Sequence, residues 1–180
     1  NTMEPEAPGT LISSFSEPGK IKSIAAKDGI TAIKIQSSRM LLAYGFLRKI
    51  FEVFEKYKTS IDMITTSEVA VSVSIDNDMH LNEIIAELSN IASVEVEKNQ
   101  TIVSIVGNEI AKTDAVLNKL FQAINEVPIT MVSYGGSPHN ISLLIPSEHK
   151  TKTLQLSCRV FYVIVTREKE LNGNEINFNS

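Results

Sequence analysis

The order of predicted elements constrains this chain more than any other feature, because one pattern of strands and helices occurs twice. Alternating apolar residues predict strands at Ile30–Gln36 and Val69–Ile75, and between them apolar residues at helical spacing predict a helix from Phe46 to Tyr57. The other expected strands are Ser60–Glu68, Ser93–Glu97, Thr101–Val106, Ile129–Ser133 and Asn140–Ile145, and the other expected helices lie around Leu81–Leu88 and Val116–Ile124. A βαββαβ unit of this kind is the ferredoxin-like split βαβ motif. The prediction is an α+β fold of two tandem ferredoxin-like units, with antiparallel sheets that carry their helices on one face.

The ends of the chain fit this pattern less well. Short strands are expected at Thr10–Ser14 and Ile21–Ala26, with turn signals at Asp28-Gly29 and at Asn77-Asp78, the latter also a predicted N-cap. Residues 1–20 are interpreted as a linker or the end of a preceding lobe. Pro146-Ser147 opens a helical segment, but alternating apolar residues follow it, so residues 159–180 are left as an uncertain tail.

Composition places the chain among globular proteins. Its 180 residues suffice for one ordinary domain or two small ones, and the 43% hydrophobic content suffices for a core. The net charge of −4 disfavours nucleic-acid binding, which needs a basic face. The sequence has one cysteine, no apolar run long enough for a membrane span and no signal peptide at Asn1–Gly9. A cytoplasmic protein with no membrane partner is therefore expected.

Motifs that would carry catalysis or bind a metal are missing from this sequence. It contains neither a GxxxxGK[ST] phosphate loop nor a GxGxxG turn, and its three histidines are scattered, so neither a catalytic nor a metal site is predicted. Cys158 is interpreted as a small buried apolar residue and not a nucleophile. Asp76 and Asp78 are interpreted as turn and cap residues. The loop Gly135–Asn140 is expected to connect two strands, and this interpretation is favoured over a ligand site.

Two segments together suggest a site for a small zwitterion. Met40–Leu47 leads into the first predicted helix, whose free amides at Gly45, Phe46 and Leu47 suit a carboxylate. Ser60–Glu68 follows, where Asp62 and Glu68 could balance ammonium groups. The hydroxyls of Thr66 and Ser67 could add hydrogen bonds. Spacing alone leaves a purely structural polar strand end as an equal alternative.

At this point the residues resemble a known family. Ser37–Asp76 (SSRMLLAYGFLRKIFEVFEKYKTSIDMITTSEVAVSVSID) resembles the first ACT repeat of aspartokinases, the kinases that phosphorylate aspartate at the start of lysine, threonine and methionine synthesis. Ile102–Ile110 and Ile129–Pro146 resemble the second repeat, and Ala7–Ser13 resembles the passage from the kinase lobe. The likeness reaches to about Leu156. It identifies the chain as similar to the C-terminal regulatory region of a lysine-sensitive aspartokinase.

The resemblance implies an organisation as well as a function. Residues 30–98 would be the first ACT domain and residues 99–158 the second, with residues 21–29 adding a strand to the second, so that the units interlock. Two copies would form a homodimer with the effector, lysine, in the crevice between first repeats. The sequence lacks the kinase lobe and its Lys-Phe-Gly-Gly-Thr loop. This fragment is therefore expected to have no catalytic centre and no cofactor, since ATP and magnesium would belong to that lobe.

The family's lysine-binding motif can be transferred by position. It nominates Met40, Ala43, Gly45, Phe46, Leu47, Ser60, Ile61, Asp62, Thr66, Ser67 and Glu68 as effector-binding residues. Leu42 and Ala43 depart from the bacterial pattern, which has His and Ser there, and this affects the expected affinity more than the identity of the ligand. Whether threonine or S-adenosylmethionine acts with lysine stays open.

Two other functions compete with lysine sensing. The chain could be a tandem ACT dimerisation module that binds no ligand. It could also be a small acyl-phosphate hydrolase, for which Arg39 would be the phosphate-binding arginine, although no partner asparagine is evident.

Overall fold

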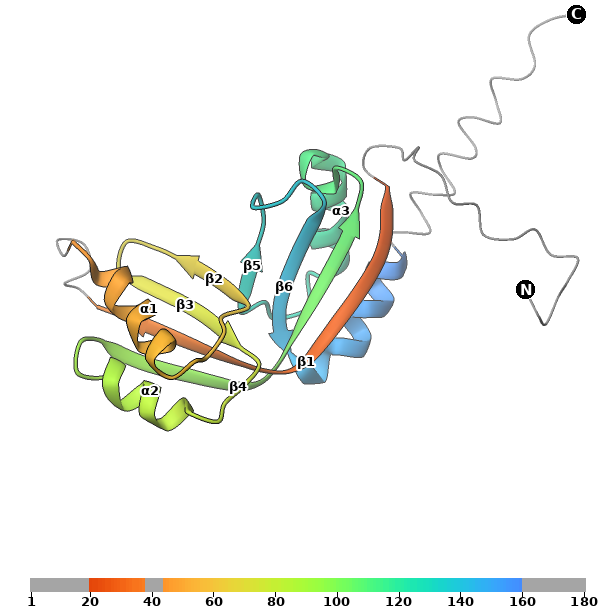
Figure 1. Ribbon diagram of the computed structural model, residues 1–180. Helices are drawn as coiled ribbons and strands as arrows, with labels where there is room; N and C mark the ends of the chain where they lie inside the picture. Colours follow the sequence, from red (N-terminus) through yellow and green to blue (C-terminus); the bar gives the residue numbers. More distant parts are fainter. Residues whose placement is uncertain (1–19, 38–43, 160–180) are drawn as a thin grey trace, which may run out of the picture.

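The computed structural model describes residues 20–37 and 44–159, which form one six-stranded sheet flanked by helices (Figure 1). The strands are β1 (Ile21–Gln36), β2 (Met63–Thr66), β3 (Ala70–Ile75), β4 (Ser93–Gly107), β5 (Met131–Ser133) and β6 (Asn140–Pro146). The helices are α1 (Phe46–Lys56), α2 (Leu81–Leu88) and α3 (Asp114–Ala123), with short 3-10 turns η2 (Ile110–Lys112) and η3 (Ser147–His149). The strand order is β2-β3-β1-β4-β6-β5, and every pairing is antiparallel.

The long strands β1 and β4 pass through both halves of the sheet. The C-terminal part of β1 pairs with β3 on one side and with the N-terminal part of β4 on the other, and with β2 they complete one ferredoxin-like unit, here called the first unit (residues 30–98). The opposite parts of β1 and β4 also pair with each other, and β4 there pairs with β6, which pairs with β5, in the second unit (residues 20–29 and 99–159). Ile21–Lys27 pairs with Ile102–Gly107, so the second unit takes its last strand from the start of the described chain. The predicted ferredoxin-like fold of interlocked units is confirmed, with one shared sheet in place of two.

The two long strands bend where the units meet. Their register shifts between Lys27 and Ile30 and again between Ile30 and Ala32. Gly29 has a φ of 75° and Asn99, on the facing strand, a φ of 58°, as expected for bulged positions. The expected turn at Asp28-Gly29 is therefore wrong, because this glycine bends a continuous strand and does not end it.

Each unit has its own apolar core under its helices. In the first unit, Ile33, Val71 and Val73 of the sheet pack against Phe46, Ile50 and Phe54 of α1 and against Leu81, Ile84 and Leu88 of α2. In the second unit, Val103, Ile105, Ile141 and Leu143 pack against Val116 and Leu120 of α3 and against Ile124, which follows it. A third, smaller cluster lies between the units, where Met63 of edge strand β2 meets Met131 of edge strand β5. The edge strands of the two units therefore lie next to each other (Figure 1).

Two local predictions need correction and one is confirmed. The helical segment expected from Pro146-Ser147 is present, since residues 150–159 form a helix that follows η3, with Thr153 and Ser157 on its buried face. Because these buried residues are polar, the apolar residues of this helix do not show helical spacing. Cys158 is exposed on it, so the prediction of a buried cysteine is wrong. The N-cap of α2 is His80, and not Asn77-Asp78. The strand expected at Thr10–Ser14 lies outside the described residues.

Candidate functional site

The start of α1 has the features of an anion site. Gly45 precedes the helix with a φ of 80°, a left-handed conformation that favours glycine. Among the described residues, no side chain caps this helix start, and the first turn of α1 contains no acidic residue. The amides of the first turn have no partners within the helix. The side chain of Phe46 anchors this turn in the first core, while Leu47 is half-exposed. The turn is thus fixed in place, with its amide end available to a carboxylate or similar group.

The hydroxyl and carboxyl groups of Thr66, Ser67 and Glu68 lie at the end of β2. Ser67 closes a tight turn to β3, since its amide donates to the carbonyl of Ala70 at 2.8 Å. Thr66, Ser67 and Glu68 are all exposed. This turn and the start of α1 both lie at the end of the first unit that points away from the second unit (Figure 1). Part of the predicted site is therefore gathered at one end of the sheet.

Asp62 lies at the opposite end of β2, next to the second unit. Its amide donates to the carbonyl of Ser74 at 2.8 Å, and the next amide, of Met63, donates to the Ser74 hydroxyl at 3.0 Å. Of its neighbours, Ser60 is exposed and Ile61 packs against the first core. The backbone of Asp62 is therefore held by the sheet, which fixes the position of its carboxylate.

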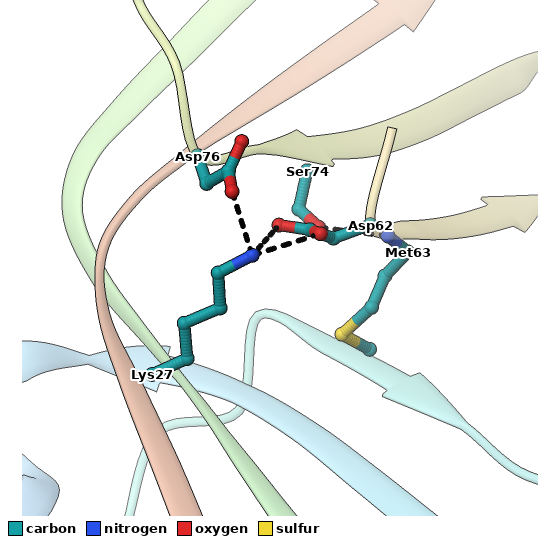
Figure 2. Close-up of polar contacts among 5 residues, drawn as sticks. All are labelled: Lys27, Asp62, Met63, Ser74 and Asp76. Atoms are coloured by element: carbon teal, nitrogen blue, oxygen red, sulfur yellow. Dashed lines mark hydrogen bonds and ion pairs between the residues drawn. The ribbon is translucent and has the colours of Figure 1, made fainter. Parts of the chain in front are cut away.

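The carboxylate of Asp62 is bound by a lysine of the same chain (Figure 2). The Lys27 ammonium donates to both Asp62 oxygens at 3.0 Å and to Asp76 Oδ2 at 2.8 Å. These bonds raise the pKa of Lys27, with Asp76 contributing most and Asp62 next. The pKa of Asp76 is lowered, chiefly by its hydrogen bond to Lys27. With two carboxylates and one ammonium, the cluster keeps one excess negative charge and can attract a further cation.

The two ends of the predicted site are too far apart for one small ligand. Asp62 and Ser67 are separated by about 16 Å of extended chain, and α1, which runs between the same two ends, has 11 residues and is also about 16 Å long. The two ends of a lysine molecule, across its four-carbon stem, are only about 7 Å apart. In a single copy of the chain the predicted site residues therefore fall into two groups, here called half-sites, one at Gly45–Leu47 with Thr66–Glu68 and one at Ser60–Asp62.

Sequence reasoning missed Lys27 and interpreted Asp76 only as a turn residue. Lys27 precedes the motif that carries the resemblance, and Asp76 is the last residue of that motif. No local spacing links residues so far apart in the chain. The register of β1 against β4 brings Lys27 to this place. Arg39, Met40 and Ala43 lie outside the described residues.

The glycine-rich loop of the second unit packs on its own chain. The Tyr134 hydroxyl donates to the carbonyl of Ala111, and the amide of Glu109 donates to Nδ1 of His139. The amide of Ala111 donates to the carbonyl of Pro138 at 3.1 Å. These bonds favour a structural role for the loop Gly135–Asn140.

Within residues 20–37 and 44–159, no three His, Cys, Asp or Glu side chains are placed together to hold a metal ion. No helix in these residues has the length and apolar character that crossing a bilayer requires.

Comparisons with known proteins give consistent relatives. An ACT-domain family model matches residues 103–161. Chloroplastic aspartokinase 3 of Arabidopsis thaliana is 35% identical over 170 residues, which cover 86% of this chain and 30% of the relative. The chain spans about a third of the length of the curated relatives it matches.

Solved structures agree with the sequence relatives. A putative C-terminal regulatory domain of aspartate kinase from Porphyromonas gingivalis W83 is 44% identical, with a TM-score of 0.70 over 78% of this chain and 96% of that one. Aspartokinase III of Escherichia coli, in complex with lysine and aspartate, is 31% identical, with a TM-score of 0.73 over 89% of this chain and 38% of that one.

Proposed function

Because this chain belongs to the aspartokinase family, as a regulatory region built from ACT domains, we propose that it senses lysine at its first unit and forms a homodimer through that unit. The parent protein is proposed to be an aspartate kinase that uses ATP and magnesium in a separate lobe. Lysine binding here would inhibit that lobe. A cytoplasmic location is part of this proposal, and the single cysteine suits it because disulfides are rare in that compartment.

The chemistry of the two half-sites matches the two ends of lysine. The amides at the start of α1 can hold the carboxylate, helped by the partial positive charge of the helix N-terminus. Asp62 can hold an ammonium, and the Ser67 hydroxyl and Glu68 carboxylate can serve the second one. The E. coli relative with 31% identity was solved with lysine bound, which supports the choice of ligand.

The distance between the half-sites is the observation that carries the proposal. Since one lysine cannot reach both ends of β2, a complete site needs a second copy of the chain. β2 is an edge strand, and antiparallel pairing of two β2 strands would place the Asp62 end of one copy beside the Thr66–Glu68 end of the other. The dimer would thus complete two lysine sites at once.

The surface around β2 supports this pairing. Large apolar side chains stay exposed on the first unit, with Ile64 on β2, Val69 just before β3, and Leu47 and Phe51 on α1, each 38–41% exposed. Exposed apolar side chains beside an unpaired strand edge are typical of an interface.

A dimerisation module without a ligand is the second candidate function. It is favoured by one observation, which is that both oxygens of Asp62 are already occupied by Lys27. Under this alternative the Lys27–Asp62 pair would be purely structural.

Calorimetry with each common amino acid, followed by light scattering with and without lysine, distinguishes the two functions. Lysine sensing predicts saturable heat for lysine with one site per chain, on a particle of dimer mass at tens of micromolar. A dimer that gives no heat with lysine would establish the ligand-free module. A lysine-binding monomer would contradict the shared site.

A further inference from the structure

Lys27 connects the two units at the point where the proposed ligand would bind. It belongs to the part of β1 that pairs with Ile102 in the second unit. Its two carboxylate partners, Asp62 and Asp76, lie in the first unit, before β2 and after β3. Figure 2 shows the ammonium between these two acids, with the side chain rising from β1. The ion pairs therefore cross the boundary between the units.

A small pocket lies beside this contact. It has a volume of about 270 Å³ and is lined by Ala25, Ala26, Lys27, Asp62, Met63, Ile102, Ser104 and Ser142. The Ser104 and Ser142 hydroxyls are hydrogen-bonded to each other at 2.9 Å. The Lys27 side chain is 48% exposed and that of Asp62 is 25% exposed, so the pair lies at the mouth of the pocket and not in a core. Lys27 can therefore move without opening the fold.

We propose that Lys27 is an internal competitor for the ammonium of the effector, and that it lowers the effector affinity by holding Asp62 in the ligand-free chain. The inference rests on the proposed function, in which Asp62 binds the ammonium of lysine. Lys27 carries the same group on the same four-carbon stem. Because it already donates to both Asp62 oxygens, a free lysine must displace it to gain the full contact.

Asp76 makes the displacement feasible. It lies 2.8 Å from the same ammonium, so Lys27 stays paired with a carboxylate after Asp62 changes partner. The release then removes one of the two ion pairs that Lys27 makes with the first unit and leaves the other. Ligand binding at the first unit would in this way alter a contact to the second unit.

Three variants of the chain test this proposal in the calorimeter. Lys27→Met removes the competitor and should tighten lysine binding by about two- to fivefold, the factor that corresponds to one partly exposed ion pair. Lys34→Met is the matched control: Lys34 lies on the same strand, is 50% exposed and pairs with Glu95 at 3.5 Å. It should leave the affinity unchanged. Asp76→Asn removes one of the two carboxylate partners of Lys27. Lys27 should then hold Asp62 more strongly, so lysine binding should weaken.

The double variant Lys27→Met/Asp76→Asn separates competition from simple charge effects. If Lys27 competes, the Asp76→Asn change loses most of its effect once Lys27 is absent, whereas an independent charge effect would persist. Thermal melts check that each variant is folded, and Lys27→Gln replaces Lys27→Met if the latter is not.

The outcomes distinguish this inference from the proposed function. Tighter binding by Lys27→Met together with weaker binding by Asp76→Asn supports the inference. Parent chain that binds lysine, with Lys27→Met binding equally or more weakly, overturns the competitor and leaves the proposed function intact. A parent chain that binds no lysine overturns both.

Discussion

Asp28 accepts a hydrogen bond from Lys150, a residue 122 positions later in the sequence, and a second one from the hydroxyl of the buried Thr101 at 2.9 Å. Thr101 also lies 2.8 Å from the Ser147 hydroxyl in η3. The bulge of β1 is thus tied to the start of the last described helix. Lys27, the preceding residue, forms its ion pairs with the first unit. Of these two consecutive residues, one therefore binds the first unit and the other binds the second.

The Asp28 contact should make the stability of the fold depend on pH in the acid range. Its hydrogen bond to Lys150, and then the one from Thr101, lower the pKa of Asp28. A carboxyl whose folded-state pKa is lowered stabilises the fold above its unfolded pKa, near 4, and this contribution is lost as the pH falls through the folded value. We expect the free energy of unfolding in urea to fall below about pH 5.

Asp28→Asn should reduce this loss, since the side chain no longer titrates. Lys150→Met should reduce it in the same way, and the double variant should show little further change. An acid dependence of unfolding that Asp28→Asn leaves unaltered would show that the contact is not kept in solution.

Asp62→Ala should weaken lysine binding without unfolding the chain. Leaving the effector ammonium without its carboxylate partner costs on the order of 2–5 kcal/mol of binding free energy, or about 30-fold to several thousand-fold in affinity. The melting temperature should change little, because Lys27 keeps Asp76 as a partner. In the full-length enzyme the change should give resistance to lysine with normal basal activity.

Asp78→Ala provides the control for this measurement. Asp78 is an exposed acid that pairs with Lys98 at 3.0 Å and not with Lys27. Its loss should not affect calorimetric lysine binding. Equal affinities for Asp62→Ala and the parent would place the pocket elsewhere.

A site shared between two copies predicts complementation between defective chains. Asp62→Ala disables one half-site, and Ser67→Ala/Glu68→Ala disables the other. Each variant alone should bind lysine poorly. After unfolding and refolding together, mixed dimers should contain one intact site each, so calorimetry should recover about a quarter of the parental stoichiometry if the chains pair at random. No recovery in a mixture whose mixed dimers are verified by mass would exclude the shared site.

Gly107→Ala should destabilise the fold. A methyl group at Gly107 would meet the carbonyl oxygen of Lys20 and the buried side chain of Ile110. Crowding of this kind costs about 1–3 kcal/mol, which urea unfolding can measure. Gly136→Ala is the control, since a methyl group there meets nothing within 4 Å. Equal stabilities of the two variants would contradict the close packing at Gly107.

The sequence predicted the fold where local pattern decides it. Alternation in Ala70–Ile75 and helical spacing in Phe46–Lys56 matched observed elements, because each buries one apolar face. Long-range pairing was harder to predict. Asp28-Gly29 has the composition of a turn, but its conformation is set by the facing β4 strand, which no local rule can include.

The candidate site divides in the same way. The resemblance placed Asp62 and the Gly45 turn by position, which requires only the motif. That they lie at opposite ends of β2 depends on strand direction. The ion pair between Lys27 and Asp62 depends on the register of β1, because Lys27 lies thirty-five residues before Asp62 in the chain. Contacts of this range are set by the assembled sheet.

The sharing of β1 and β4 also governs how the chain can be made. On the ribosome, the C-terminal part of β1 can pair with β3 early, but Ile21–Lys27 has no partner in β4 until Ile102–Gly107 has been synthesised. This part of the strand must therefore wait unpaired, a state prone to mispairing and aggregation. A gene cut between the units would leave the second unit without Ile21–Lys27 and the first unit with that segment unpaired. The pair of units should accordingly be inherited, expressed and engineered as one indivisible piece.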